Sequence, residues 1–301
     1  MGVMILLMFA AAGAVLPAAP PAPLPSVITD GAGRAVKIPA APQRIVSLSP
    51  AATDILELAL GVHTEVVGVT RYCRIPAAEE KRVVRVGGVL DPDYERILAL
   101  KPDLVIAPLL ADSALQDKLI SLGLTVVVLH PEGLQGVIDD IHMLGLVTGH
   151  PAEGGAAAQG IENIRALAAR RWQSVPEPQR LRVLVRMGDV CPAPGSYVDD
   201  LIAAAGGRNV LPRGPKAWVQ VSPESVLQFA PDLVVTIRSS DDVSLSPVSE
   251  KSAPYRSVTI SAGDDFYRPG PSVGGALWKL ARVLDPVRFP EASPPAVLAA
   301  P

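Results

Sequence analysis

The chain has 301 residues, enough for two ordinary α/β domains and a sizeable core. Its formal net charge at pH 7 is −3 and no segment is rich in Lys or Arg, so the composition gives no reason to expect a nucleic-acid partner. Hydrophobic residues make up 49% of the chain and charged residues 19%, a balance that suits a compact soluble protein.

The N-terminus is typical of an export signal. An apolar run from Val3 to Leu16 is too short to span a bilayer comfortably, and small residues and prolines follow it. No Lys or Arg precedes the run, and an uncleaved membrane anchor is the alternative. We predict a signal peptide over residues 1–24 and a mature protein in the periplasm. We expect no N-terminal lipidation, because the first 30 residues contain no Cys.

Short strands and helices alternate in the first half of the chain. Residues 28–39 alternate in polarity on either side of 30–33, which predicts a β-hairpin. Further strands are predicted at 44–48, 66–69, 103–107 and 124–129. The first helix between them should begin after Ser49, a good N-cap, and end at Gly61. This alternation predicts a parallel sheet wound with helices, and we assign residues 25–131 to an N-terminal α/β lobe.

The second half of the chain repeats this pattern after a helical interruption. Residues 132–175 have a helical pattern only, with Pro151 as a candidate break, and we assign them to a bridging helical segment. Strands are then predicted at 181–187, 232–237 and 255–260, with a closing helix at about 272–284. We assign residues 176–286 to a C-terminal α/β lobe. The proline-rich end, residues 287–301, is predicted to be a disordered tail.

One segment of the first lobe recurs in the second. The matched positions, 129 residues apart, are Glu95 and Glu224, Leu98 and Leu227, and the tetrapeptide Pro-Asp-Leu-Val at 102–105 and 231–234. Two similar lobes imply a cleft between them. Each glutamate stands near a helix start, where capping and the helix dipole favour a carboxylate, but this local reason does not explain why both copies keep it. Two matched carboxylates would suit a two-fold symmetric partner with two basic pockets.

Aromatic residues make up only 4% of the chain, so their positions are informative. Several follow predicted strands, namely Tyr72, Tyr197, Trp218 and the run Phe266-Tyr267-Arg268. In open parallel α/β sheets, ligands bind beyond the carboxyl ends of the strands. These side chains therefore predict a cleft for a large, flat, partly apolar ligand. The alternative is that the rings only seal the edges of the lobes.

Standard enzyme signatures are absent from the sequence. There is no GxSxG, GxxxxGK[ST] or HExxH, and four scattered histidines do not suggest a metal site. An α/β hydrolytic enzyme would have to use a carboxylate such as Asp189 or Asp265 in the cleft, paired with a nucleophile or base that the sequence does not offer. We therefore expect no catalytic residue, no metal and no covalently bound cofactor.

The two cysteines, Cys73 and Cys191, follow strands in equivalent parts of the two lobes. In an oxidising compartment they are candidates for a disulfide across the cleft. Two separate thiols are the alternative. The sequence alone does not choose between them.

Taken together, these segments resemble the periplasmic substrate-binding proteins of ABC importers for cobalamin and Fe(III)-siderophores. The matching residues run from ITDGAGRAVKIPAAPQRIVSLSPAATDILELALG through VVGVTRYC, YERILALKPDLVIA, AAGGRNVL and WVQVSPESVLQFAPDLVV to YRPGPSVGGALWKLARVLDP. They cover roughly residues 27–286. The resemblance implies two Rossmann-like lobes with parallel sheets, joined by a long single helical backbone, with a ligand cleft between the lobes. It also implies that Glu95 and Glu224 dock onto arginines of a permease dimer.

The cobalamin-binding members of this family use aromatics and an arginine at the cleft. By position the resemblance implies a ligand site formed by Tyr72, Trp218 and Arg268, to which Tyr267, Phe266 and Tyr197 are added as neighbours. The stretch VGVTRYC followed by Ile-Pro is similar to the cobalamin-type members. One departure is Val89, which stands where a cobalamin binder can place a Trp, so one wall of the cleft is less aromatic.

These expectations combine into a monomeric, non-enzymatic receptor. It would capture a corrinoid such as cobalamin and deliver it to an ABC permease dimer in the inner membrane, which works with a cytoplasmic ATPase. A siderophore or haem receptor of the same family is the alternative. Basic side chains such as Arg71, Arg74 and Arg186 would favour that alternative if they point into the cleft.

Overall fold

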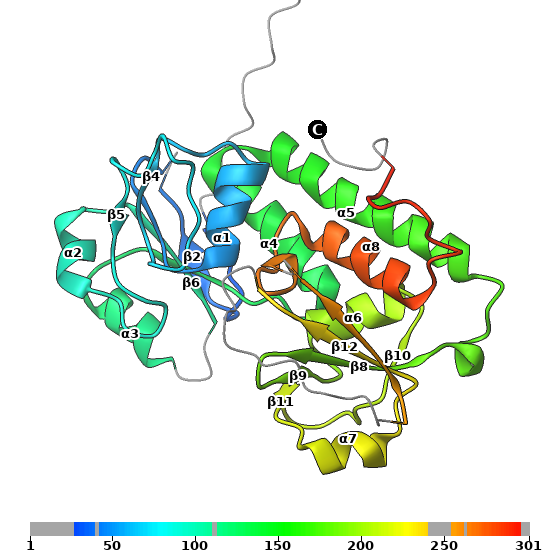
Figure 1. The fold of residues 1–301 in the computed structure, drawn as a ribbon. Coiled ribbons are helices and arrows are strands. Elements are labelled where there is room, and N and C mark those ends of the chain that lie inside the picture. The colour runs from blue at the N-terminus through cyan, green and yellow to red at the C-terminus, as the bar shows by residue number, and fades with distance from the viewer. Residues whose placement is uncertain (1–26, 40–41, 110–112, 240–253, 262–263, 296–301) are drawn as a thin grey trace, which may run out of the picture.

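The computed structural model describes residues 27–39, 42–109, 113–239, 254–261 and 264–295, which form two α/β lobes and a pair of helices that packs against both (Figure 1). The predicted α/β class with parallel sheets is confirmed. The predicted signal peptide, residues 1–24, lies outside the described residues. Among the described helices, none has the length and apolar character needed to cross a membrane.

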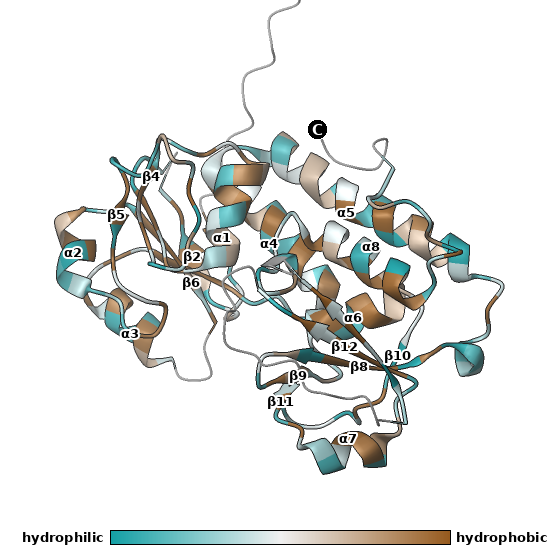
Figure 2. Ribbon diagram, in the orientation of Figure 1, coloured by the Kyte–Doolittle hydropathy of each residue, from teal (hydrophilic) through white to brown (hydrophobic). Residues whose placement is uncertain are grey.

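The N-terminal lobe is built on a five-stranded sheet in which all neighbouring strands are parallel. In sheet order its strands are β5 (Val84–Arg85), β4 (Val66–Val69), β3 (Ile45–Ser47), β6 (Leu104–Pro108) and β7 (Val126–Leu129). Successive residues face opposite sides, so Ile45 joins one buried cluster and Val46 the other. Because both faces are covered by helices, the central strands are mostly apolar, as Figure 2 shows in brown, whereas the edge strand β5 carries Arg85.

Helices cover the two faces of this sheet in a fixed order. α1 (Pro50–Asp54) and the π-helix η1 (Ile55–Ala59) lie on one face, and α2 (Tyr94–Ala99) and α3 (Ala114–Ser121) lie on the other. The predicted start of the first helix is confirmed, because the Ser49 side chain accepts a hydrogen bond from the Ala52 N–H. The predicted hairpin is also present, as β1 (Val27–Thr29) paired with β2 (Ala35–Lys37).

The C-terminal lobe has a four-stranded parallel sheet and a short antiparallel ribbon. In sheet order the strands are β10 (Arg208–Asn209), β8 (Arg182–Met187), β12 (Leu233–Ile237) and β13 (Arg256–Ile260). The ribbon pairs β9 (Cys191–Pro192) with β11 (Trp218–Val219). α6 (Tyr197–Ala204) and α8 (Val273–Leu284) cover one face, and α7 (Pro223–Phe229) covers the other. Two 3₁₀ turns, η2 (Glu177–Gln179) and η3 (Asp264–Phe266), complete the described elements.

The bridging segment consists of two helices, α4 (Gly133–Thr148) and α5 (Pro151–Trp172), packed against each other. The helical segment is present and breaks at the predicted position before Pro151, so the long helix that joins the lobes is α5, with α4 packed beside it. Gly149 has a left-handed φ of 82°, which ends α4 before Pro151 begins α5. α5 contacts η1 in the first lobe and α8 in the second, so it spans both lobes (Figure 1).

The end of the chain is ordered further than its composition predicted. Phe289 is fully buried, and the guanidinium of Arg171 lies 5.0 Å from the centre of its ring. Arg171 also forms an ion pair of 2.9 Å with Glu291. A buried ring and a charge pair fix this segment on α5 and α8 despite its prolines, so the predicted disordered tail is corrected as far as residue 295. Residues 296–301 lie outside the described part of the chain.

Candidate functional site

Two predicted ligand residues meet where the lobes face each other. Tyr72 follows strand β4 of the first lobe, and Arg268 follows the turn η3 of the second. The Nη2 atom of Arg268 donates a hydrogen bond of 2.9 Å to the backbone carbonyl oxygen of Tyr72. This contact joins loops at the carboxyl ends of strands in both lobes, the region where ligands of α/β sheets bind.

The buried carboxylate of Asp54 also contacts the Arg268 guanidinium. The Nη1 atom of Arg268 lies 3.4 Å from Oδ1 of Asp54, at the end of α1, and both side chains are largely buried. Burial raises the pKa of Asp54, and the nearby positive charges of Arg268 and Arg74 oppose that rise. The arginine is therefore held in place by the first lobe before any ligand arrives.

A cavity of about 320 Å³ opens beside this junction. Three carboxylates and two arginines of the described chain line it, together with apolar residues and one serine. The charged lining residues are Asp54, Glu57, Asp265, Arg74 and Arg268. One of these carboxylates, that of Asp265, forms an ion pair of 2.7 Å with Lys279. The lining thus combines apolar surface with charges of both signs, and it has no net positive character.

The aromatic residues continue the site into the second lobe. The ring of Trp218, on β11, lies 5.8 Å from that of Tyr197. The Tyr197 hydroxyl donates a hydrogen bond to the carbonyl oxygen of Phe266, two residues before Arg268. The Tyr267 hydroxyl donates to the carbonyl oxygen of Ile237 at 3.0 Å. Contacts and chain neighbours thus connect all six predicted ligand residues.

These aromatics differ in what they expose. Tyr72 is 54% exposed, Tyr267 is also exposed and Trp218 is half-buried. Phe266 and Tyr197 are buried, and burial raises the pKa of the Tyr197 hydroxyl. The expectation that these two line the cleft is therefore corrected. They lie beneath the surface, where they support Trp218 and the loop that carries Arg268.

The three arginines that would favour an anionic ligand are placed differently. Arg71 is paired with Asp91 at 2.9 Å, and its guanidinium lies 5.1 Å from the centre of the Tyr72 ring. Arg186, on β8, is half-buried. Arg74 lines the cavity beside Arg268.

The two cysteines are buried free thiols, so the candidate disulfide is not formed. Cys73 lies in the large core cluster, where its sulfur is 3.0 Å from the Thr53 hydroxyl. Cys191 belongs to a separate cluster on the outer face of the second sheet. Because the two residues sit in different buried clusters, the bridge that their matched sequence positions suggested does not arise. Burial raises the pKa of Cys191 to about 11.

Sequence reasoning missed two buried acidic residues of the site, Asp54 and Glu57. Glu57 lies on the π-helix η1, a form that is frequent at functional sites, and its carboxylate is 2.6 Å from Nδ1 of His63. Burial raises the pKa of Glu57. A signal was present in the sequence, since both carboxylates interrupt the otherwise apolar helical segment AATDILELAL.

The two matched glutamates lie on the short helices that cover the outer faces of the sheets. Glu95 is the second residue of α2 and Glu224 the second residue of α7, and both are exposed. Figure 1 shows α2 at the far end of the first lobe and α7 at the tip of the second. A hydrogen bond from the backbone of Glu224 and one from the Ser222 side chain lower the pKa of the Glu224 carboxyl.

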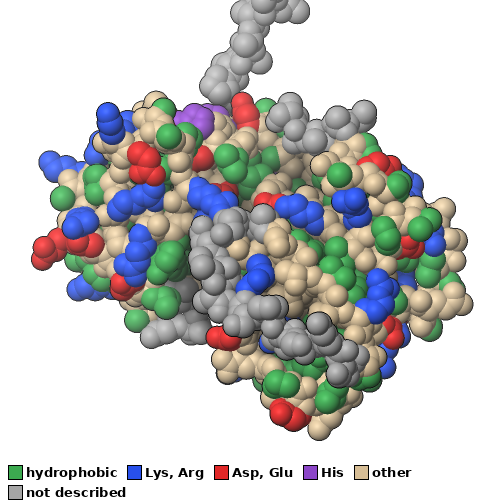
Figure 3. Space-filling view, viewed as in Figure 1, with side chains coloured by type: hydrophobic (Ala, Val, Ile, Leu, Met, Phe, Trp, Pro, Cys, Tyr) green, Lys and Arg blue, Asp and Glu red, His purple; other side chains and the backbone are tan. Residues whose placement is uncertain are grey.

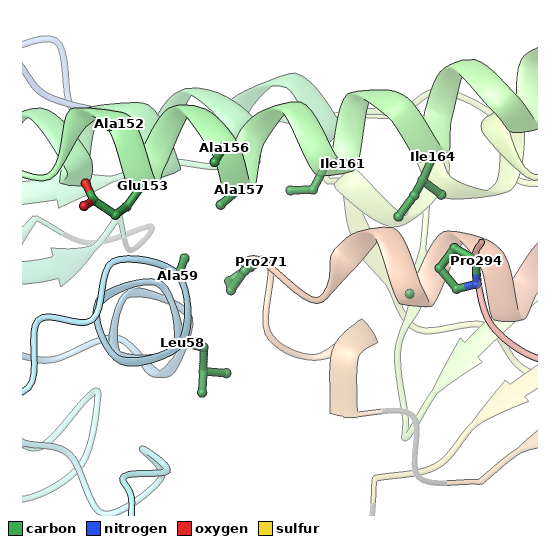
Figure 4. Close-up of a pocket in the computed structure, with 12 residues that line it drawn as sticks. Leu58, Ala59, Ala152, Glu153, Ala156, Ala157, Ile161, Ile164, Pro271 and Pro294 are labelled. Carbon is green, nitrogen blue, oxygen red and sulfur yellow. The ribbon is translucent and has the colours of Figure 1, made fainter. Parts of the chain in front are cut away.

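Two other cavities are separate from this site. A groove of about 490 Å³ lies between α5, η1 and the start of α8, and small or apolar residues such as Ala156, Ile161 and Pro271 line it (Figure 4). A second cavity of about 760 Å³ lies between the β1–β2 hairpin and α4. The described lining of both excludes every predicted ligand residue. Among the described residues, no group of three or more His, Cys, Asp or Glu side chains is arranged to hold a metal ion.

The sequence matches the periplasmic binding protein family over residues 45–250. It is 31% identical over 242 residues to a cobalamin-binding protein of Halobacterium salinarum, a match that covers 77% of this chain and 64% of that protein. The chain thus spans just under two thirds of that relative's length. It is 27% identical over 266 residues to a vitamin B12-binding protein of Yersinia pestis, covering 84% of this chain and 90% of the relative.

Solved structures share the fold. The molybdate-binding protein MolA of Haemophilus influenzae aligns with a TM-score of 0.73 at 22% identity, over 88% of this chain and 92% of that one. The vitamin B12-binding protein BtuF of Vibrio cholerae aligns with a TM-score of 0.65 at 24% identity, over 81% of this chain and 96% of that one. A periplasmic heme-binding protein of Pseudomonas aeruginosa aligns with a TM-score of 0.64 at 22% identity, over 85% of this chain and 95% of that one. At these identities the likeness establishes the fold, which does not determine the ligand.

Proposed function

Because this chain belongs to the periplasmic binding protein family, we propose that it is a non-enzymatic receptor that captures a corrinoid between its lobes and delivers it to an ABC permease. The observation that carries the proposal is the junction of Arg268 with Tyr72, to which the exposed Tyr267 and the half-buried Trp218 are linked. An arginine flanked by aromatic faces suits a ligand that combines a large flat ring system with polar side groups.

The names of the two sequence relatives support a corrinoid as the ligand. One is a cobalamin-binding protein and the other a vitamin B12-binding protein, and the second match covers most of both chains. The solved structures support only the receptor fold, because proteins for molybdate, vitamin B12 and heme all share it, with TM-scores of 0.73, 0.65 and 0.64.

A haem or Fe(III)-siderophore receptor is the second candidate, and Arg74 is the residue that favours it. Arg74 and Arg268 line one cavity and would attract an anionic ligand. Asp54 and Asp265 line the same cavity, however, and offset that attraction. Arg71 is already paired with Asp91. The charge balance therefore favours a ligand with little net negative charge.

The described site gives little support to a hydrolytic enzyme. Of the two carboxylates considered, Asp189 is exposed and Asp265 is paired with Lys279. Within the described part of the chain, neither carboxylate is hydrogen-bonded to a nucleophile, which such catalysis would need. A receptor requires no such group, and the proposal assigns no residue a catalytic role.

The proposed partner is a permease dimer in the inner membrane, reached from the periplasm by a monomeric receptor. Glu95 and Glu224 support this part, because each is an exposed carboxylate on a helix of a different lobe. Exposed charges at helix starts contribute only about 0.3–1 kcal/mol to folding. If the two carboxylates pair with permease arginines away from water, the loss of either carboxylate would cost about 2–5 kcal/mol of docking free energy.

The ligand is tested by titrating the protein with cobalamin, cobinamide, haem, a ferric siderophore and molybdate in equilibrium dialysis. Cobalamin and cobinamide should bind and should quench the fluorescence of Trp218. The other two tryptophans, Trp172 and Trp278, are buried in the cluster around Phe289 and serve as internal references. Trp218→Phe should therefore abolish the quenching. Binding of haem or a siderophore without binding of any corrinoid would replace the primary proposal with the second candidate.

A further inference from the structure

The repeated helices expose a second matched residue type beside the glutamates. Leu98 on α2 is 39% exposed and Leu227 on α7 is 54% exposed. Each stands three positions after its glutamate, so carboxylate and leucine are neighbours on one helix face. Figure 3 shows acidic and hydrophobic side chains together over α7 at the lower tip of the molecule.

The fold buries these leucines only in part. In each helix a neighbouring residue supplies the buried anchor, Ile97 in α2 and Val226 in α7. A single exposed leucine is ordinary on a protein surface. Here two exposed leucines stand at equivalent positions of the two lobes, and each is next to an exposed glutamate. Chance is a poor explanation for this match, because an exposed apolar side chain adds nothing to the stability of the fold.

The geometry of the repeat limits what can cover these surfaces. Both helices are capped in the same way, since Asp93 accepts a hydrogen bond from the Arg96 N–H and Ser222 accepts one from the Ser225 N–H. The glutamate and leucine are thus presented alike in each lobe. A partner that contacts both lobes must offer the same site twice, with a cationic group for the carboxylate and an apolar hollow for the leucine.

We propose that Leu98 and Leu227 complete two equivalent docking surfaces, each formed by one glutamate and one leucine, for a two-fold symmetric protein with a cationic group and an apolar hollow in each subunit. This rests on the proposed function, in which that protein is the permease dimer. The glutamates supply a salt-sensitive attraction that speeds encounter. The leucines supply a contribution that salt does not screen, through the burial of apolar surface.

The experiment compares Leu98→Ser, Leu227→Ser and their combination with the wild-type chain. Docking is measured on the cobalamin permease–ATPase complex of the same organism, held in nanodiscs. Each single variant should weaken docking about tenfold or more, the factor expected for losing a buried leucine. The factor should be the same at low and high salt. Glu95→Gln with Glu224→Gln should instead lose affinity mainly at low salt.

Ile120→Ser is the matched control. Ile120 is 43% exposed on α3, in the same lobe as Leu98, but it lies outside the repeated segment. It should dock like the wild type. All variants should keep the melting temperature and the affinity for cobalamin in dialysis. Unchanged docking of the leucine variants, or a loss confined to one lobe, would overturn the leucine proposal alone. Failure of the wild-type chain to bind both cobalamin and the permease would overturn the proposed function and this inference with it.

Discussion

Arg268 and Asp54 are 214 residues apart in the sequence, yet the Nη1 atom of the arginine lies 3.4 Å from Oδ1 of the aspartate. The pair joins the last loop of the second lobe to the first helix of the first lobe. The same guanidinium reaches the Tyr72 carbonyl oxygen. The Arg268 side chain therefore belongs to the proposed ligand site and also holds the second lobe against the first.

Arg268→Ala should destabilise the protein, because it leaves the buried Asp54 carboxylate without its nearest cation. We expect a loss of about 2–4 kcal/mol in the free energy of unfolding at pH 7, measured by urea denaturation. Adding Asp54→Asn should recover part of that loss, since a neutral amide needs no counter-charge. Strictly additive effects of the two substitutions would contradict the coupling.

Asp140 should make stability depend on pH. Burial raises its pKa from 3.8 to about 7, so the folded state favours the protonated form. The protonated Asp140 carboxyl contributes its full share to the free energy of unfolding below 3.8, the pKa of the group in the unfolded chain. This share is lost as the pH rises through about 7. Asp140→Asn should therefore match the wild type near pH 4 and exceed it at pH 8, by on the order of 2–4 kcal/mol. An equal difference at both pH values in urea unfolding would show that the carboxyl does not titrate in this way.

Cys73 and Cys191 should behave as two protected thiols. Both are buried, and burial raises the pKa of each, so little thiolate is available to react. Without reductant, native protein should resist alkylation at neutral pH, and protein in denaturant should gain two alkyl groups by mass spectrometry. A denatured chain that takes up none until reductant is added would reveal a disulfide instead.

Phe289 should anchor the end of the described chain. It is fully buried against Trp172 and Trp278, with Arg171 stacked on its ring. Phe289→Ala should cost about 3–5 kcal/mol of unfolding free energy. It should also make the segment after residue 285 sensitive to proteases. The exposed Val287 is the control, and Val287→Ala should leave both properties unchanged.

Much of the secondary structure followed from local sequence. The strands, the first helix cap and the repeated helix depend on residues within about a dozen positions of one another, and local patterns predict such elements well. The short strands β5, β9, β10 and β11 were missed. Each contains two residues, too few for a period-two pattern to emerge.

The register of the repeat needed the tertiary structure. The tripeptide Pro-Gln-Arg before each lobe's first parallel strand matches Arg44 with Arg180. In the fold Arg182 takes the equivalent place, because Arg44 donates to the carbonyl oxygen of Leu100 at 2.8 Å and Arg182 to that of Phe229 at 2.6 Å. The neighbouring strands set this alignment, and a sequence match of three residues does not contain it.

The sequence by itself determined that two like α/β lobes carry matched glutamates, and that aromatics and an arginine follow the strands. This much depends on residue type and spacing along the chain. Only the tertiary structure decided which of those side chains a ligand can reach. Phe266 and Tyr197 are buried while Tyr72 is exposed, because burial depends on what packs against a residue from distant parts of the chain. The pairing of Arg268 with Asp54 exists only because both lobes fold against the same helical pair.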